Sequence, residues 1–147
     1  MPNQIHISPV NAENREAIIS LLRSENLPVA DLATELPNFF TATDNGLIIG
    51  VVGLETYERN GLLRSLAVKP EYRNMKIAAA LVAEVERVSR HCGLDAIYLL
   101  TETAKDYFLK KGFMPVDRTD APEPLKQSSE FNHVCPASAI LMKKALL

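Results

Sequence analysis

The chain has 147 residues, of which 47% are hydrophobic and 23% are charged, and its formal net charge at pH 7 is −2. This length and balance predict one globular domain with a core of its own, and they exclude a disordered chain. Because the net charge is small and negative, it gives no electrostatic reason to expect a nucleic acid as partner.

The sequence shows no sign of export or of membrane insertion. No apolar run approaches the roughly 20 residues that a membrane-spanning helix needs, and the polar first ten residues, with two prolines, do not resemble a signal peptide. Cys92 and Cys135 lie far apart in the sequence and are expected to be free thiols. We therefore expect a cytoplasmic protein with no membrane partner.

The first 40 residues predict one strand and two helices. A short strand is expected over residues 5–10, where apolar and polar residues alternate. Residues 11–24 predict a helix with Asn11 as its N-cap. Residues 25–40 are interrupted by two prolines and predict a loop with a short second helix. The apolar face expected for the first helix consists of Ala17, Ile18, Leu21 and Leu22.

Two Asn-Gly pairs predict hairpins between residues 39 and 68. Asn45-Gly46 and Asn60-Gly61 each lie between runs of strand-forming residues. Asn-Gly readily adopts positive φ at both central positions of a tight turn, so each pair is a strong hairpin signal. Three consecutive antiparallel strands are therefore expected.

The second half of the chain predicts alternating helices and strands. Residues 77–91 are amphipathic with helical spacing and end before Gly93, and residues 96–101 form a nearly continuous apolar strand. A short helix is expected from Thr103, which has capping-box spacing, to the residue before Gly112. The last expected elements are a strand at residues 113–116, a loop over 117–136 with a helical turn near Lys126, and a closing strand at 138–144.

This order of elements predicts an α/β fold in a single domain, residues 1–147. The sheet is expected to be mixed and mostly antiparallel, with about six or seven strands and with helices on both of its faces.

The connection at residues 69–76 joins a strand to the helix at 77–91 and contains no glycine. The N-terminus of a helix offers unpaired N–H groups, and its dipole favours an anion. Arg73 and Lys76 add positive charge to this turn. On these grounds alone, a phosphate-bearing ligand and an ordinary solvated basic turn both stay open.

The element order and two motifs together resemble the GNAT superfamily of N-acetyltransferases. That family has an apolar strand, the pattern x-P-x-x-R/Q-x-x-G-x-G/A, and an amphipathic helix. This chain reads LAVKPEYRNMKIA from Leu66 to Ala78, with Pro70 and Arg73 in place and Lys76 where glycine is usual. AKDYFLKKGF, residues 104–113, is similar to the family pattern A-x-x-x-Y/F-x-x-x-G-F.

Part of the chain resembles a narrower group. LLTETAKDYFLKKGFMPVDR and CPASAILM are similar to segments of the acetyltransferase domain of N-acetylglutamate synthases. They are also similar to stand-alone amino-acid acetyltransferases associated with arsenic resistance.

The resemblance implies an enzyme with acetyl-CoA as co-substrate. It would move an acetyl group to the amine of a small molecule, foremost an amino acid or an analogue, by direct attack in a ternary complex. Two alternatives stay open: a non-catalytic CoA-binding or regulatory domain, and an acetyltransferase for protein lysines or N-termini. Proteins of this kind are commonly homodimers, so a homodimer is also considered.

The resemblance also implies which residues hold acetyl-CoA. Backbone groups of the strand before the turn would bind the acetyl-pantetheine arm, with an N–H near Val68 directed at the acetyl oxygen; such a donor can be worth about 3 kcal/mol. Lysine lacks the conformational freedom of glycine, but Lys76 keeps its N–H and can extend its ammonium toward the phosphates. The residues expected to bind the cofactor are Leu66, Ala67, Val68, Arg73, Asn74, Met75, Lys76, Ile77, Ala78 and Ala79, together with Phe108.

Phe108 stands where many relatives have a tyrosine that protonates the departing thiolate. Tyr107 is adjacent, but one residue of helix turns the side chain by about 100°. Tyr107 as the acid therefore competes with ordinary half-buried packing. A thiolate with a pKa of about 8.5 can leave without a strong acid, so the loss of that tyrosine does not argue against catalysis.

Two charged residues near the predicted acetyl site are candidates for removing a proton from the acceptor and for binding its carboxylate. Glu55, near the end of a central strand, is a candidate base, against a solvated strand-end carboxylate. Arg64 interrupts an apolar run and by alternation shares a face with Leu66 and Val68. It is a candidate clamp for a substrate carboxylate, against a structural or exposed ion pair.

Two serines are weaker candidates, and no metal site is expected. Ser65 and Ser138 can add hydrogen bonds to the acceptor. Pro136 stands where the resemblance to the synthases suggests an arginine, so another small amino acid is as plausible an acceptor as glutamate. His133 and Cys135 have no further ligands at suitable spacing, so they do not predict a metal.

Overall fold

The computed structural model describes residues 5–27, 29, 32, 38–128 and 139–146 of the chain. By their contacts the residues divide into two compact units. The first unit consists of residues 1–54 and 65–87, and the second of residues 55–64 and 88–147. Each unit is described by itself below.

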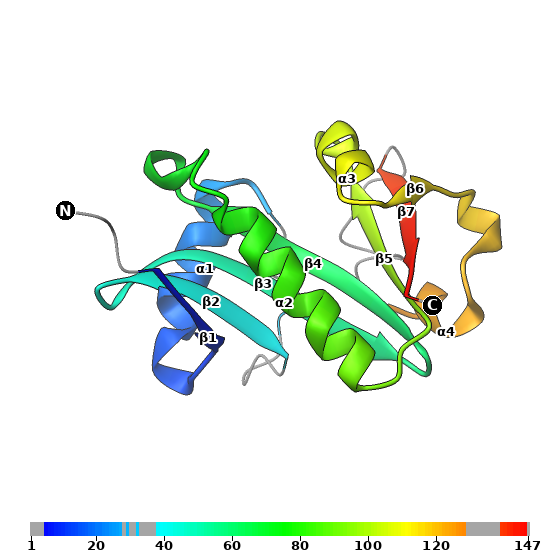
Figure 1. Cartoon of the computed structure of the whole chain (residues 1–147), viewed down its shortest axis with the longest axis horizontal. Coiled ribbons are helices and arrows are strands. Elements are labelled where there is room, and N and C mark those ends of the chain that lie inside the picture. Colours follow the sequence, from blue (N-terminus) through cyan, green and yellow to red (C-terminus); the bar gives the residue numbers. More distant parts are fainter. Residues whose placement is uncertain (1–4, 28, 30–31, 33–37, 129–138, 147) are drawn as a thin grey trace. The chain divides into compact units, whose positions relative to one another are not determined.

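The described elements form a mixed, seven-stranded sheet with the strand order β1-β2-β3-β4-β5-β7-β6 (Figure 1). The pair β4/β5 is parallel, whereas β1/β2, β2/β3, β5/β7 and β6/β7 are antiparallel. The predicted α/β fold with a mixed sheet is confirmed. In chain order the elements are β1 (Ile5–Pro9), η1 (Ala12–Asn14), α1 (Arg15–Ser24), β2 (Phe39–Asp44), β3 (Leu47–Tyr57), β4 (Asn60–Val68), η2 (Pro70–Tyr72), α2 (Ile77–His91), β5 (Ala96–Thr101), α3 (Lys105–Lys110), β6 (Met114–Pro115), η3 (Arg118–Asp120), α4 (Glu123–Lys126) and β7 (Ile140–Ala145).

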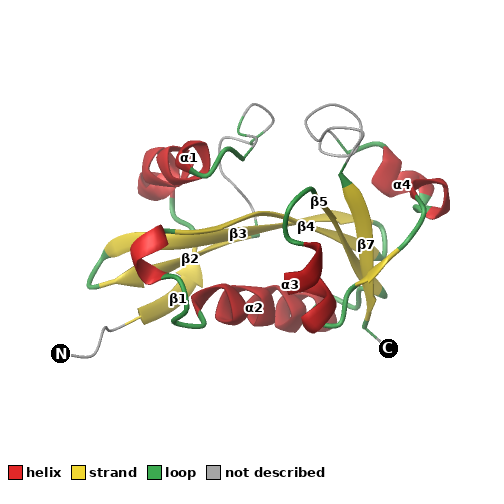
Figure 2. Ribbon diagram, turned by 90° about the horizontal axis from the view of Figure 1, so that it is seen from above, coloured by secondary structure: helices red, strands yellow, loops and turns green. Residues whose placement is uncertain are grey.

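The first unit packs two helices on a sheet of strands β1 to β4. Figure 2 shows α1 and α2 on opposite faces of β1, β2 and β3. Burying each large apolar side chain contributes roughly 1.5–3 kcal/mol, so the two apolar helix stripes fix this arrangement. The cluster that includes the α1 stripe consists of Ile18, Leu21, Leu22, Phe39, Ile48, Val51 and Ala67.

The second unit packs α3 and α4 with β5, β6, β7 and the hairpin end of β3 and β4. Phe108 of α3 meets Phe113 edge-on, with ring centroids 5.5 Å apart. Along β5 the side chains alternate, so Ile97 and Leu99 face away from Tyr98. The cluster that buries α4 consists of Leu62, Ala96, Tyr98, Ala121, Leu125 and Leu141.

One of the two predicted hairpin turns is confirmed and the other is wrong. Asn45 and Gly46 connect β2 to β3 with φ of 50° and 87°. The next turn lies at Glu58 and the residue after it, with Glu58 at φ 58°. Asn60 and Gly61 instead begin β4 and pair with β5. The pairing with β5 therefore decides the register here, over the local preference of Asn-Gly for a turn.

The helix expected over residues 77–91 is confirmed in both bounds, and Gly93 follows it at φ 76°. Asn11 caps the first helical segment by accepting the Glu13 amide, although that segment begins as a 3-10 turn. Ala17 is exposed, unlike the rest of its predicted face. The helix expected within residues 25–40 falls mostly outside the described residues.

The expected capping box at Thr103 is wrong. Ala104 is the N-cap of α3 and makes no side-chain bond. Thr101 takes the capping role, because its Oγ1 accepts the Ala104 amide at 3.0 Å. The helical turn near Lys126 and the closing strand are confirmed as α4 and β7. In the described part of the chain, no helix is both long and apolar enough to cross a membrane.

Candidate functional site

The turn between β4 and α2, residues 69–76, belongs to the first unit, and we call it the α2 turn. Its backbone takes the left-handed conformation twice, with φ of 68° at Asn74 and 62° at Lys76. This conformation costs a lysine roughly 1 kcal/mol, whereas asparagine tolerates it well. Lys76 stands where the sequence pattern suggests a glycine, and it takes a left-handed conformation that glycine adopts without strain.

The first backbone amides of α2 directly follow the α2 turn. The first helical hydrogen bond runs from the Ala80 amide to the Lys76 carbonyl at 3.1 Å. The amides of Ile77, Ala78 and Ala79 therefore have no acceptor within the helix. Since the side chains of residues 73–76 are all exposed, an anion can approach this end of α2.

Contacts with Ile49, Asp44 and Glu25 help to hold the α2 turn within the first unit. The Lys69 amide donates to the Ile49 carbonyl at 2.8 Å. The Tyr72 hydroxyl donates to Asp44 Oδ2 at 2.7 Å, and this bond, followed by burial, raises the pKa of Tyr72. Arg73 forms an ion pair with Glu25 just after α1. The predicted phosphate-binding arginine is therefore engaged by a carboxylate of its own chain.

β4 is irregular just before the turn. Ser65 is buried and has φ 58°, although it lies within a strand. β4 pairs with β5 through Asn60, Gly61 and Leu62, which precede Ser65. A left-handed residue interrupts the period of two in a strand. The alternation that predicted a common face for Arg64, Leu66 and Val68 is therefore broken at Ser65.

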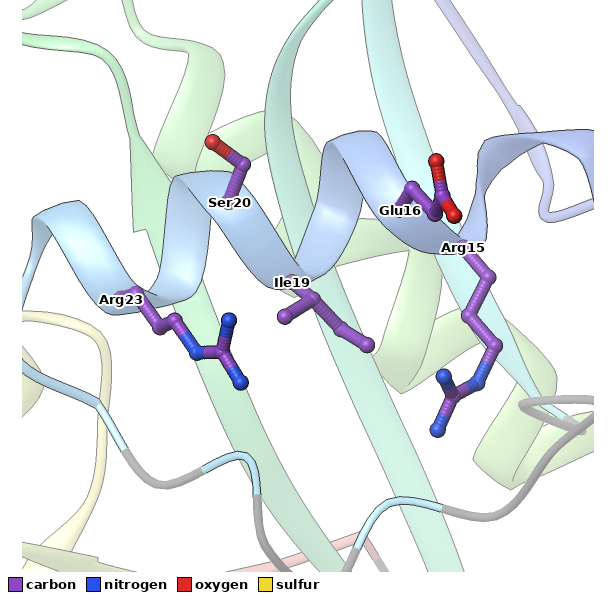
Figure 3. A pocket seen from close by; sticks show the side chains of 5 residues that line it. All are labelled: Arg15, Glu16, Ile19, Ser20 and Arg23. Carbon is purple, nitrogen blue, oxygen red and sulfur yellow. The ribbon is translucent and has the colours of Figure 1, made fainter.

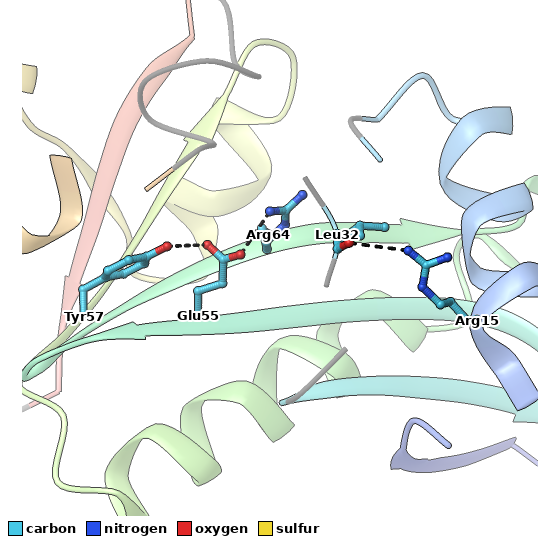
Figure 4. Close-up of polar contacts among 5 residues, drawn as sticks. All are labelled: Arg15, Leu32, Glu55, Tyr57 and Arg64. Atoms are coloured by element: carbon cyan, nitrogen blue, oxygen red, sulfur yellow. Dashed lines mark hydrogen bonds and ion pairs between the residues drawn. The ribbon is translucent and has the colours of Figure 1, made fainter. Parts of the chain in front are cut away.

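In the second unit Glu55 accepts hydrogen bonds on both of its carboxylate oxygens (Figure 4). The Tyr57 hydroxyl donates to Oε1 at 2.8 Å, and Arg64 Nη1 donates to Oε2 at 3.1 Å. The Ser128 side chain hydrogen-bonds to the Tyr57 hydroxyl. The Arg64 side chain is 0% exposed, whereas that of Glu55 is 29% exposed. We call Glu55, Tyr57, Arg64 and Ser128 the Glu55 cluster.

The local fold explains why these groups meet. Glu55 and Tyr57 are two residues apart in β3 and share a face. The short turn after Tyr57 returns the chain as β4, which places Arg64 on the neighbouring strand. Burial, then the hydrogen bond and the charge of Glu55, raise the pKa of Tyr57. Tyr57 therefore stays a protonated donor across the neutral pH range.

The cluster contains two predicted residues and two that sequence reasoning missed. Glu55 and Arg64 were predicted singly, and the structure joins them. Tyr57 carries a usable signal, because a polar residue two positions from Glu55 at a strand end falls on the same face. Ser128 follows α4 in a polar loop and carries no such signal.

The remaining predicted residues of the second unit lie on α3 or outside the described residues. The Tyr107 hydroxyl is buried and has no hydrogen-bond partner within the described part of the chain, so it is not joined to Glu55. Burial raises its pKa. Phe108 is 5% exposed and packs edge-on against both Tyr107 and Phe113. Ser138 lies outside the described residues.

The cysteines and the surface along α1 offer fewer groups for binding or catalysis. Cys92 is an exposed free thiol, as predicted, while Cys135 and His133 lie outside the described residues. Considering only the described residues, no three His, Cys, Asp or Glu side chains gather as a metal site. A depression lies along α1, where Arg15 and Arg23 point the same way on either side of Ile19 (Figure 3). Glu16 and Ser20 complete its lining.

Comparison with known sequences gives a consistent result. A family model described as an acetyltransferase (GNAT) domain matches residues 35–115. The amino-acid acetyltransferase of Ralstonia nicotianae is 29% identical over 115 residues, which cover 77% of this chain and 25% of that protein. The one of Pseudomonas fluorescens is 33% identical over 86 residues, covering 57% and 20%. The matched part of this chain thus spans about a quarter, or less, of these relatives.

Comparison with solved structures shows the same fold. N-acetylglutamate synthase from Neisseria gonorrhoeae, solved with coenzyme A and N-acetyl-glutamate, superposes with a TM-score of 0.85 at 17% identity, covering 100% of this chain and 36% of the synthase. Rv2747 from Mycobacterium tuberculosis, solved in a complex with CoA, superposes with a TM-score of 0.82 at 20% identity, covering 97% and 99%.

Proposed function

Because the chain belongs to the acetyltransferase (GNAT) family, we propose that it transfers the acetyl group of acetyl-CoA to the amino group of an amino acid or a close analogue. The observation that carries the proposal is the α2 turn, which keeps left-handed backbone at Asn74 and Lys76 and presents helix amides beside Arg73. The names of the relatives, amino-acid acetyltransferases, support the class of acceptor.

The α2 turn supplies the groups that a pyrophosphate needs. The amides from Asn74 to Ala79 would hold its oxygens at the positive end of the α2 dipole. Arg73 would add a charge-assisted hydrogen bond once Glu25 releases it. The backbone of Leu66 to Val68 would hold the pantetheine arm, and Phe108 would pack against the cofactor.

The Glu55 cluster supplies the groups that an amino acid needs. Arg64 is buried and paired with Glu55, and an acceptor carboxylate would take the place of Glu55 on the Arg64 Nη1 group. That exchange would free Glu55 Oε2 at the moment when the acceptor's ammonium needs a base. Binding of the acceptor carboxylate to Arg64 and release of Glu55 as the base would then occur together.

The proton balance follows from this arrangement. The ammonium gives its first proton to Glu55, which passes it to solvent, and the neutral amine forms the new bond to the acetyl carbon. The carbon–sulfur bond breaks, and the second proton of the nitrogen neutralises the CoA thiolate. Burial raises the pKa of Tyr107, so its buried hydroxyl suits a hydrogen bond to the sulfur better than full proton transfer. Ser65 and Ser138 stay proposed acceptor ligands.

Titration calorimetry with acetyl-CoA, followed by a thiol-release screen of the free amino acids, tests the proposal. We expect binding, and thiol release above the amine-free control for at least one amino acid. An absence of binding would exclude both this proposal and a protein acetyltransferase. Binding without release for any amine would point to a regulatory CoA-binding domain. Release with a lysine peptide only would point to a protein acceptor. A cytoplasmic location and a homodimer stay predictions, and size-exclusion chromatography tests the second.

A further inference from the structure

Among the described residues, the hydrogen bond from Tyr57 is the contact of the Glu55 carboxylate that the proposed exchange leaves in place. Arg64 holds Oε2 at 3.1 Å, and Tyr57 holds Oε1 at 2.8 Å. When an acceptor carboxylate takes Arg64, the Glu55 side chain loses its cationic partner. A glutamate has three rotatable bonds, and it is 29% exposed here, so without a second anchor it would swing toward solvent.

We propose that Tyr57 is the positioning residue that keeps Glu55 directed at the acceptor's ammonium after Arg64 has been given to the acceptor's carboxylate. This inference rests on the proposed function. Tyr57 acts through Glu55 and need not touch the substrate.

The surroundings of Tyr57 suit this task. The phenol proton is used on Glu55, so the Tyr57 oxygen is free to accept from Ser128, which is only 2% exposed. Ser128 is itself fixed after α4, where its amide donates to the Leu125 carbonyl at 3.0 Å. The phenol ring has two rotatable bonds and lies in the same strand as Glu55. A relay of hydrogen bonds, from Ser128 through Tyr57 to Glu55, thus consists of short, rigid or buried groups.

The test compares Tyr57→Phe, Glu55→Gln and the double variant with the unchanged chain, using the amino acid that releases most thiol. We expect Tyr57→Phe to lower kcat about tenfold, the size of one lost hydrogen bond to a charged group. The KM for acetyl-CoA should not change. Loss of the base in Glu55→Gln should lower kcat by about 100-fold or more. In the Glu55→Gln background, Tyr57→Phe should add nothing, because the residue acts through Glu55.

Tyr98→Phe is the matched control, since it removes the same hydroxyl from a different tyrosine of the second unit, one that is buried; its kcat should stay within about twofold. An unchanged kcat in Tyr57→Phe overturns the inference. So does an equal loss of kcat with and without Glu55, because that marks a structural effect.

Should Tyr57→Phe fail to fold, Ser128→Ala takes its place. It removes the donor to the Tyr57 oxygen, and we expect a two- to threefold lower kcat with an unchanged KM for acetyl-CoA. A kcat equal to that of the unchanged chain would overturn the relay. Failure of the proposed function is separate: the unchanged chain would then acetylate no amino acid, and the positioning role would fall with it.

Discussion

The α2 turn in the first unit and the Glu55 cluster in the second are built from different kinds of groups. The turn offers backbone amides, and its side chains from Arg73 to Lys76 are exposed. The cluster consists of side chains around a guanidinium with no exposed surface. Backbone donors survive most substitutions, whereas a buried ion pair depends on every member. This difference explains why a turn with lysine in place of glycine can still offer its backbone amides.

The largest expected effect is an asymmetry within the Glu55 cluster. Glu55→Ala removes the carboxylate from an entirely buried guanidinium and should lower the free energy of unfolding by about 3 kcal/mol. Arg64→Met leaves a carboxylate that is 29% exposed and still bound by Tyr57, and methionine fills much of the volume. It should cost about 1 kcal/mol. Urea unfolding at pH 7 measures both values.

Equal losses in these two variants would contradict the comparison. They would mean that the arginine is no more dependent on its partner than the glutamate is. If both losses were also below about 1 kcal/mol, the cluster would resemble a surface ion pair.

The second effect concerns ligand binding at the α2 turn. Arg73→Ala should weaken acetyl-CoA binding about fivefold, because the Arg73 side chain is 54% exposed and such a contact is worth about 1 kcal/mol. The loss should shrink as salt is raised. Arg87→Ala is the matched control, since Arg87 is an exposed arginine of the same unit, paired with Glu84 at 2.8 Å. If both variants weaken binding equally, Arg73 has no specific role.

Local patterns predicted the fold well where the periodicity is long and the ends are marked. The helix over residues 77–91 has fifteen residues of helical spacing and a following glycine, so its bounds follow from the sequence alone. Asn60-Gly61 failed because the pairing of β4 with β5 outweighs a dipeptide's preference for a turn. Thr103 failed because Thr101, two residues earlier, reaches the same helix end.

The site was predicted as separate residues and not as an arrangement. Glu55 and Arg64 stood out because charges interrupt apolar strands, but one-dimensional spacing does not show that they bind each other. The left-handed Ser65 breaks the alternation used to assign faces in β4. A left-handed residue inside a strand has no dependable signature in a single sequence, apart from glycine or asparagine. Tyr57 and Ser128 were missed because a single sequence does not show that Tyr57 bonds to Glu55 or that Ser128 bonds to Tyr57.

The third prediction addresses Lys76 at φ 62°. Lys76→Gly should raise the free energy of unfolding by roughly 0.5–1 kcal/mol, because glycine adopts this conformation without strain. Lys76→Ala keeps the strain and should change it little. Since the backbone already has the required shape, we expect both variants to bind acetyl-CoA slightly less well through loss of the ammonium. Tighter binding in the glycine variant alone would show instead that lysine hinders the phosphates.

The smallest effect tests whether the ion pair of Glu25 with Arg73 opposes the cofactor. If acetyl-CoA must take Arg73 from Glu25, then Glu25→Gln should tighten binding about two- to threefold, since an exposed pair is worth about 0.2–1 kcal/mol. Glu71→Gln is the matched control, because it removes an equal charge from an exposed residue of the α2 turn. A gain shared by both variants would reflect the general field at the turn.

In an Arg73→Ala background, Glu25→Gln should give no gain at all. Calorimetry of the two single variants and the double variant measures this coupling directly. A gain that persists without Arg73 would place the effect of Glu25 on the turn's amides rather than on the arginine. Acetyl-CoA binding at the α2 turn would then depend on backbone amides and not on the Arg73 side chain, whereas the Glu55 cluster depends on side chains.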